Sequence, residues 1–271
     1  MRDPVELVDE MEWLIKEYKA NDFEFFDLTA IIKKDWIIEF CNELKKRELN
    51  DITWQLPVGT RSEALDEEVL KIIYETGCRF VCYAPESGST KSLKMIKKRV
   101  KLDRLIKSVK SSVKIGHTTK LNFIIGFPHE TLLDCLKTIS FALYCALRFG
   151  ISDILFSTFT PYPGSELFDQ LHKNGQISNL DDKYFYNLSS NSDIFNSHSF
   201  SKHVNTAMLA FYRLGGMSMF YIISFLLHPK RLFRLFSNVI NKREESKLDM
   251  ALIQMIDRFK RNKKTPSSRS H

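Results

Sequence analysis

The chain has 271 residues, of which 44% are hydrophobic and 27% charged, as in an ordinary soluble globular protein of one large domain or one domain with an appendage. Five irregularly spaced cysteines exclude a disulfide framework, and no signal peptide is visible, so we expect free thiols in a reducing cytoplasm. The net charge of +7 is carried by the C-terminal part, because residues 228–271 hold 12 Lys or Arg and 4 Asp or Glu.

The predicted elements alternate between helices and strands over the first two thirds of the chain. Asp3 is typical of a helix N-cap, as is Thr131 with Asp134 three residues on, and Gly77, Gly116 and Gly150 are expected to follow helix ends. Strands are predicted near 23–27, 52–56, 79–83, 120–125 and 153–159, with Pro57 ending the second. Five strands separated by helices predict a parallel sheet, open or closed into a barrel.

Three short motifs follow three of these strands directly. They are Glu-Ser-Gly-Ser at 86–89, Gly-Phe-Pro-His-Glu-Thr at 126–131 and Pro-Tyr-Pro-Gly-Ser-Glu at 161–166. Loops at the carboxyl ends of parallel strands are where such folds bind ligands. We therefore expect the three loops to converge on one site.

The pattern changes after the third motif, so we divide the chain into a barrel domain at 1–175 and a C-terminal extension at 176–271. Residues 176–203 read as a polar connection and 204–227 as an apolar helix. The longest uncharged stretch, 214–227, is 14 residues, too short for a membrane span of about 20. Residues 228–242 predict a basic amphipathic helix, and 258–271 predict disorder.

The three motifs, in this order and spacing, resemble those of the radical S-adenosylmethionine (radical SAM) enzymes, in particular the subgroup with a cobalamin-binding domain before the barrel. In that family they follow the fourth, fifth and sixth strands. The stretch at 2–4 is similar to the start of the family's first helix. Asp27 resembles the end of the second strand, and Trp54 with Arg61 resembles the third. The resemblance covers residues 1 to about 180.

The resemblance implies a fold and a set of cofactors. The fold is α/β, a partial (β/α)6 TIM-like barrel of radical SAM type, with strands two to six present, strand one missing and a helical C-terminal extension. The cofactors are SAM, a 4Fe–4S cluster and cobalamin. The family's Cys-x3-Cys-x2-Cys is absent, since the nearest match, Cys78-x3-Cys82, has proline at position 85. We expect no metal ligands among this chain's residues, His198 and His203 included.

Two hypotheses follow from that missing motif. The first is a truncated radical SAM enzyme, a fragment or one half of a split protein, which is inactive alone and needs an upstream polypeptide with the cluster loop. The second is a cluster-free module that binds SAM or a partner, peripheral at a membrane. The substrate expected by resemblance is an unidentified small or lipid-like molecule.

The first loop supplies three candidate cofactor-binding residues. The Glu86 carboxylate can accept hydrogen bonds from ribose hydroxyls or an amino group, and Ser87 can donate to a carboxylate. The alternative is a capped turn before a helix near Thr90. Lys98 stands where the family places a basic residue facing the methionine carboxylate of SAM; the alternative is a solvated face shared with its basic neighbours.

The other candidate cofactor-binding residues lie in the second and third loops and at two earlier strand ends. Asn122 either faces SAM polar atoms or satisfies neighbouring backbone, and Gly126 turns the chain after the fifth strand of the family. Tyr162 and Pro163 either line the adenine or form a rigid turn. The remaining two are Asp27 and Arg61, which a mutual salt bridge would explain equally well.

Two further expectations concern residues outside the loops. Cys78 and Cys82, spaced by four on a strand, should share one face and be buried apolar residues rather than ligands. Residues 228–242 are expected to bind anionic lipid, with nucleic acid less favoured and packing on the barrel as the third alternative.

Overall fold

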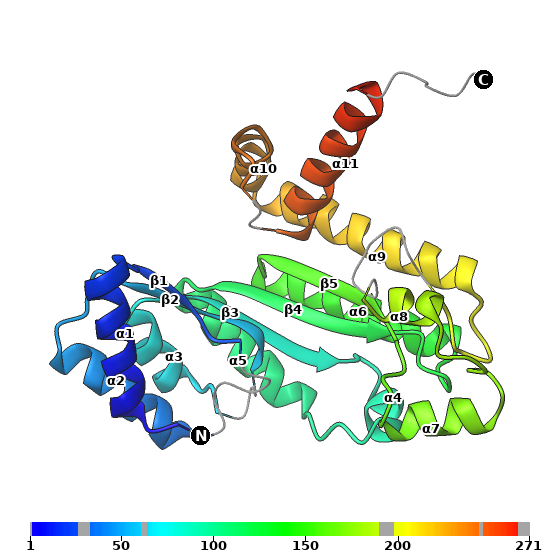
Figure 1. Cartoon of the computed structure of the whole chain (residues 1–271), viewed down its shortest axis with the longest axis horizontal. Coiled ribbons are helices and arrows are strands. Elements are labelled where there is room, and N and C mark those ends of the chain that lie inside the picture. The colour runs from blue at the N-terminus through cyan, green and yellow to red at the C-terminus, as the bar shows by residue number, and fades with distance from the viewer. Residues whose placement is uncertain (1, 27–32, 61–63, 190–197, 244–245, 265–271) are drawn as a thin grey trace.

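The computed structural model describes residues 2–26, 33–60, 64–189, 198–243 and 246–264 (Figure 1). A parallel sheet runs through it in the order β1-β2-β3-β4-β5. The strands are β1 (Asp22–Glu24), β2 (Thr53–Thr60), β3 (Cys78–Glu86), β4 (Thr118–Ile125) and β5 (Asp153–Thr158). The helices are α1 (Pro4–Tyr18), α2 (Lys34–Lys46), α3 (Glu67–Glu75), α4 (Thr90–Met95), α5 (Leu102–Ile115), α6 (Leu132–Phe149), α7 (Glu166–Lys173), α8 (Asp182–Ser189), α9 (Thr206–Leu227), α10 (Lys230–Asn241) and α11 (Lys247–Lys264).

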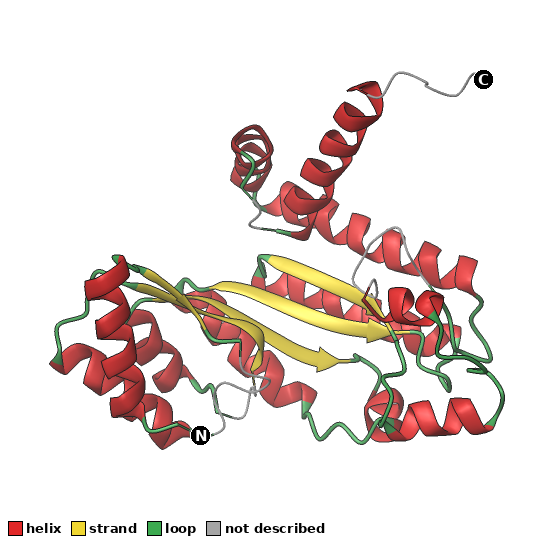
Figure 2. Cartoon of the chain, viewed as in Figure 1, coloured by secondary structure: helices red, strands yellow, loops and turns green. Residues whose placement is uncertain are grey.

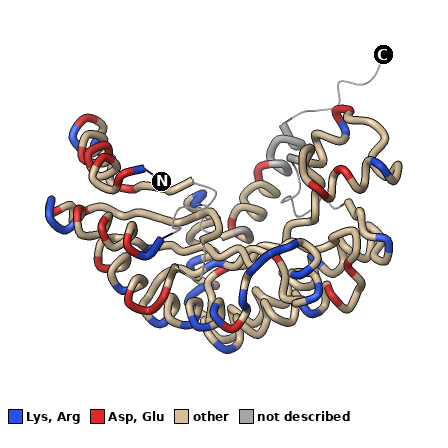
Figure 3. The backbone as a smooth tube through the Cα atoms, turned by 90° about the horizontal axis from the view of Figure 1, so that it is seen from below, with Lys and Arg blue, Asp and Glu red and all other residues tan. Residues whose placement is uncertain are grey.

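The helices cover one face of the sheet and leave the molecule curved. Helices α1, α2, α3, α5, α6 and α9 contact one another in that order, which makes a continuous outer layer (Figure 2). Seen from below, the backbone forms an open crescent, with the N-terminus on one arm and the C-terminal helices on the other (Figure 3). This is the predicted partial barrel with a helical extension.

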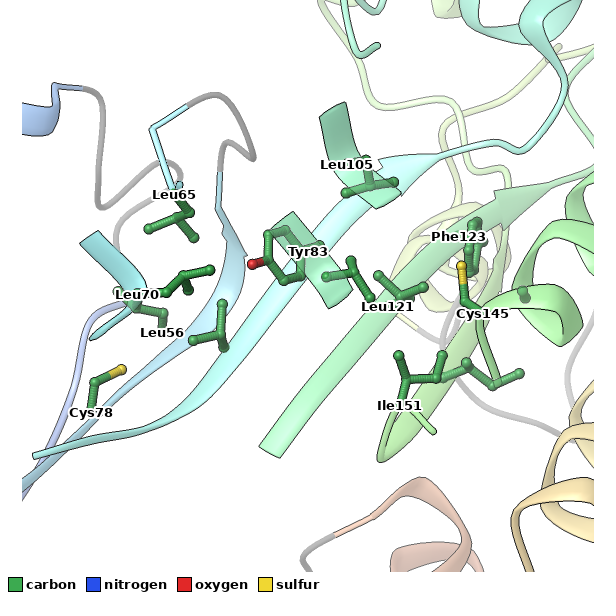
Figure 4. Close-up of a cluster of buried hydrophobic side chains, with 14 of the residues drawn as sticks. Leu56, Leu65, Leu70, Cys78, Tyr83, Leu105, Leu121, Phe123, Cys145 and Ile151 are labelled. Carbon is green, nitrogen blue, oxygen red and sulfur yellow. The ribbon is translucent and has the colours of Figure 1, made fainter. Parts of the chain in front are cut away.

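The core lies between the sheet and this outer layer. Along β4, Leu121, Phe123 and Ile125 are fully buried, whereas Asn122 and Ile124 on the opposite face are partly exposed. Figure 4 shows the side chains of the central strands meeting those of the covering helices, as Tyr83 does with Leu105 of α5. The strand alternation therefore gives the sheet an outer apolar face and an inner face with polar groups.

Several local predictions are confirmed. The Asp3 carboxylate accepts the Val5 amide at 2.8 Å, so it caps α1. Thr131 and Asp134 form a reciprocal capping box at the start of α6. Gly116 and Gly150 end α5 and α6 in the left-handed conformation that suits glycine.

Three predicted boundaries are wrong. Strand β2 continues through Pro57 to Thr60. The register of its pairing with β3 shifts after Leu56, so no interstrand hydrogen bond requires a backbone N–H at position 57, which proline lacks. Strand β3 runs beyond the predicted end at 83, past a second register shift, and ends at Glu86. The connection at 176–203 contains α8.

The expected disorder at 258–271 is wrong for residues 258–264, which belong to α11. The Ser246 hydroxyl accepts the Asp249 amide at 3.2 Å, and the Asp249 carboxylate accepts the Ser246 amide at 2.9 Å. Asp249 is buried and also accepts a hydrogen bond from Asn238 of α10 at 3.1 Å. These contacts fix the start of α11, and a basic composition does not reveal them. Residues 265–271 lie outside the described part, and the domain boundary at 175/176 stays a prediction.

The prediction that Cys78 and Cys82 share a face is also wrong, although both are buried. Trp54 is opposite Cys78, but its neighbour Gln55 is opposite Phe80, so β3 holds one extra residue there. Such a bulge moves the following side chains to the other face. Cys78 therefore faces the helices, and Cys82 lies on the inner face beside Lys120.

Helix α9 corresponds to the apolar helix predicted at 204–227. It spans 22 residues and is, by length and composition, the one helix in the described part that could cross a membrane. Arg213, the one charged residue in it, is fully buried and donates from Nε to the Phe156 carbonyl of β5 at 2.6 Å. The helix packs along α6 and β5 as part of the domain.

Candidate functional site

The three motif loops leave the sheet at the same edge. In the parallel register Glu86 of β3 is opposite Phe123 of β4, and Ile125 of β4 is opposite Thr158 of β5. Lys97, just after α4, forms an ion pair with Glu166, the last residue of the third motif. All three motif loops therefore lie at the carboxyl end of the sheet, and Lys97 after α4 reaches the third motif.

Glu86 is held in an unusual conformation at the end of β3. Its φ of 69° lies in the left-handed region, which costs a residue with a side chain about 1 kcal/mol or more. Its carboxylate accepts a hydrogen bond from the Lys98 ammonium at 2.9 Å. The two side chains are 21% and 38% exposed, so the pair stands at the surface of the site and water screens it. The sequence suggested both residues separately, but not that they pair across twelve positions.

Ser87 and Ser89 hold the first loop against α6. Ser87 is fully buried, and its hydroxyl lies 2.9 Å from that of Thr138 and accepts the Ser89 amide at 3.1 Å. The Ser89 hydroxyl caps α4 and donates to Asp134 at 3.0 Å. These contacts fit the capped-turn alternative, and a contact of Ser87 with a ligand stays a prediction.

Gly88 lets the loop lie directly on α6. A Cβ there would stand 2.6 Å from the Phe141 Cβ and 3.0 Å from the Lys137 carbonyl oxygen. Neither atom can move without shifting the helix, so a larger residue would push the first loop outward. The first loop is therefore held close against α6.

Glu130 organises the second loop. Its buried carboxylate accepts the amides of Gly126 at 2.8 Å and Phe127 at 3.2 Å, while its second oxygen has no hydrogen-bond partner among the described residues. Burial raises the pKa of Glu130, against the lowering effect of the two amides. Glu130 thereby closes the Gly126 turn, as its spacing of four residues permits.

Gly126 itself needs glycine. Its φ is 86°, and a Cβ would meet the Leu209 side chain of α9 at 2.7 Å. The turn thus brings the end of β4 against the C-terminal extension.

Asn122 is the clearest unsatisfied group on the inner face. Its Oδ1 atom is buried and has no hydrogen-bond partner within the described ranges. Buried amide oxygens are normally paired, so an orphaned one marks a place for a donor from a ligand or water. The alternative in which this oxygen satisfies neighbouring backbone is not observed.

The third loop borders a cavity of about 820 Å³. Its lining includes Ile96 and Lys97 after α4, Pro128 and His129 of the second loop, Phe159 just after β5 and Tyr162 of the third loop. Tyr162 is 54% exposed and Pro163 is also exposed. Glu86, Lys98 and Asn122 do not line this cavity.

Asp27 and Arg61 lie outside the described residues. Trp54, which shared a resemblance with Arg61, is buried on the helix side and packs edge-on against Phe25 and Phe40.

The cysteines do not fit an iron–sulfur cluster. A 4Fe–4S cluster needs converging thiolates. All five cysteines are buried, and burial raises the pKa of Cys41 to about 11 and of Cys82, Cys135 and Cys145 to about 12. In the described part of the chain no three His, Cys, Asp or Glu residues form a metal-binding group.

Comparison with known proteins identifies relatives along this stretch. An uncharacterized methyltransferase of Pyrococcus horikoshii is 30% identical over 208 residues, 76% of this chain and 44% of that protein. The anaerobic magnesium-protoporphyrin IX monomethyl ester cyclase of Rubrivivax gelatinosus is 28% identical over 172 residues, 63% of this chain and 30% of that protein. No family model matches. The chain spans less than half the length of these relatives.

A solved structure shares the fold. It is the radical S-adenosylmethionine methyltransferase TsrM from Kitasatospora setae, with cobalamin and a [4Fe-4S] cluster bound. It aligns with a TM-score of 0.55 and 16% identity, over 67% of this chain and 36% of that one.

The fold is a partial parallel α/β barrel whose three motif loops lie at the carboxyl edge of its sheet, where such folds bind ligands. The chain shares its fold with a cobalamin-binding radical SAM methyltransferase, and its sequence is similar to those of a methyltransferase and a cyclase.

Proposed function

We propose that this barrel is the SAM-binding part of a radical SAM enzyme that methylates or otherwise modifies a small or lipid-like substrate. The observation that carries the proposal is the Glu86–Lys98 pair, held at the strained end of β3 where the first motif loop begins. Strained backbone of this kind persists where the surrounding structure imposes it, typically at functional sites.

The pair suits the methionine end of SAM, which carries an ammonium and a carboxylate. Glu86 would accept hydrogen bonds from the ammonium and Lys98 would donate to the carboxylate. Because both side chains are partly exposed, the ion pair opens at little cost, on the order of 1 kcal/mol or less. Each then gains a charge-assisted hydrogen bond to the ligand.

The neighbouring groups suit the rest of such a ligand. The orphaned Asn122 oxygen can accept one hydrogen bond on the inner face of the sheet. Tyr162 and Pro163 offer flat apolar surface beside the cavity of the third loop. Together the chain's own residues would bind and orient SAM and keep water away from it.

The cluster ligands must come from outside these 271 residues in this proposal, because the five buried thiols do not converge. In radical SAM enzymes the cluster supplies the electron that cleaves SAM. An upstream polypeptide carrying the three thiolates is therefore the partner we propose for the barrel. The edge strand β1 pairs on one side alone within the described residues, which leaves an edge for a further strand.

A second candidate is a cluster-free module that binds SAM or a partner. The same buried cysteines favour it, since nothing in the SAM contacts proposed above requires the cluster. The two proposed functions use the same loop site. They differ in whether adding a polypeptide that carries the cluster produces enzymatic activity.

Equilibrium dialysis of the full chain with methyl-labelled SAM tests the loop site. The wild-type chain is expected to bind, and Glu86→Gln and Lys98→Met should each weaken binding about ten-fold or more, the value of one charge-assisted hydrogen bond. Lys45→Met is the matched control. It breaks a surface ion pair between Lys45 of α2 and Glu75 of α3 and should leave SAM binding unchanged.

Equal binding by all four proteins, or no binding by any, would contradict the proposal. Anaerobic treatment with iron and sulfide addresses the cluster separately. We expect no stoichiometric 4Fe–4S absorbance from this chain alone, and a cluster formed on its own cysteines would overturn the assignment to another segment.

A further inference from the structure

Helix α10 exposes an apolar face that the domain does not use. Leu232, Phe233, Phe236 and Ile240 recur at helical spacing and are 38%, 73%, 60% and 79% exposed. Soluble proteins seldom leave such large side chains uncovered side by side. The face therefore marks a contact with something outside the described chain.

The opposite side of α10 is already fixed to the domain. Arg231 donates to the carbonyl oxygens of Gly150 at 2.7 Å and Ile151 at 2.9 Å, and to the Ser224 hydroxyl at 2.8 Å. Asn238 is buried against Asp249 of α11. Since these contacts hold the packing side inward, the apolar face is directed away from the domain and does not pack on the barrel.

Helix α9 adds a second exposed apolar face. Phe211, Ile222 and Leu226 are 73%, 53% and 78% exposed, and Leu214 and Met219 lie on the same side. This side carries no charge, because Arg213 is buried on the other side against β5. That anchorage holds α9 along the domain, which fits a helix lying on a surface rather than one crossing a membrane.

The charge around these faces is positive. Lys230 and Arg234 lie one turn apart on the exposed part of α10, and residues 228–271 carry 12 basic against 4 acidic residues. The barrel part of the chain, 1–227, is close to neutral. An apolar face bordered by cations is the pattern of helices that lie in the interface of anionic lipid bilayers.

We propose that α9 and α10 dock this protein on an anionic membrane surface, with the α10 apolar face entering the lipid headgroup region. Nucleic acid is less suited, because phosphate contacts use cations and do not bury four bulky apolar side chains. This inference stands apart from SAM binding, and it would place the loop site of the same domain near substrates dissolved in lipid.

Vesicle flotation of the full chain tests the proposal, because aggregated protein sinks whereas bound protein rises with the lipid. We expect flotation with phosphatidylcholine–phosphatidylglycerol vesicles at low salt, and little with phosphatidylcholine alone or at high salt. Lys230→Gln with Arg234→Gln should weaken partitioning roughly five-fold per cation. Phe233→Ser and Ile240→Ser should each weaken it about ten-fold or more.

Matched controls are Trp13→Ser on α1 and Leu133→Ser on α6, apolar residues that are 52% and 59% exposed elsewhere. They should float like the wild-type chain. Circular dichroism should be the same for all variants, since every changed side chain is exposed or at the helix surface.

Three results would overturn the proposal. The first is a wild-type chain that stays at the bottom of every gradient. The second is equal flotation with neutral vesicles or equal flotation of the α10 variants. The third is a dimer in solution that the α10 variants dissociate, which would assign this face to a second copy.

Discussion

Asp134 joins the first two motif loops, and its replacement by asparagine tests how the site is held together. One carboxylate oxygen accepts the Ser89 hydroxyl of the first loop at 3.0 Å. The other accepts the amide and hydroxyl of Thr131 at 3.1 and 2.8 Å and the Lys91 ammonium at 3.2 Å. The side chain is 3% exposed, so water does not replace these partners.

These contacts fix the size of the expected effect. Burial raises the pKa of Asp134, but the hydrogen bonds from Thr131, Ser89 and Lys91 outweigh it and lower the pKa from 3.8 to about 2. At about 1.4 kcal/mol for each pKa unit, the ionised carboxylate contributes roughly 2 kcal/mol to the free energy of unfolding. Because the pKa is lowered by folding, this contribution is present above pH 3.8 and is lost as the pH falls toward 2.

Urea unfolding followed by circular dichroism measures both quantities. We expect Asp134→Asn to lose about 2 kcal/mol at pH 7 and to have a weaker pH dependence than the wild-type chain between pH 4 and 2. Asp103→Asn is the matched control, because Asp103 is an exposed acid in the first turn of α5 and should change stability by about 0.5 kcal/mol or less. An Asp134→Asn variant as stable as that control would refute the reasoning.

Three further changes test other parts of the account. Glu130→Ala leaves the Gly126 and Phe127 amides without their acceptor, and urea unfolding should show a loss of about 3 kcal/mol; a loss below about 1 kcal/mol would contradict the role of Glu130. Gly126→Ala should cost more than Gly175→Ala, because both glycines have positive φ but only the first would meet Leu209; equal unfolding midpoints would count against that contact. The five buried thiols should react with a disulfide reagent at pH 8 only after urea is added, since burial keeps their pKa high, and rapid labelling of the native chain would show that a thiol is accessible.

The sequence predicts what local patterns determine. The five strands, their order and the caps at Asp3, Thr131 and Gly150 follow from apolar runs and neighbouring residues. Consecutive βα units usually lie side by side, which gives the parallel sheet and brings the motif loops to the same end of its strands. This much of the site could be predicted before any coordinates.

The remaining features depend on partners far apart in sequence. The bulge before Phe80 arises from pairing with β2, so the strand pattern alone put Cys78 and Cys82 on one face. The Glu86–Lys98 pair needs α4 to return over the end of β3. The Asn122 oxygen lacks a hydrogen-bond partner because of the residues that surround it in the fold, and these cannot be predicted from a local sequence pattern.

The central claim is that the three loops form one SAM-binding rim. Ultraviolet photolabelling of the full chain with methyl-labelled SAM, followed by peptide mapping, tests it most directly. The account predicts label in peptides from 84–98, 120–131 or 157–166, reduced by excess unlabelled SAM and by Glu86→Gln. Label confined to the C-terminal helices, or unaffected by competition, would contradict it.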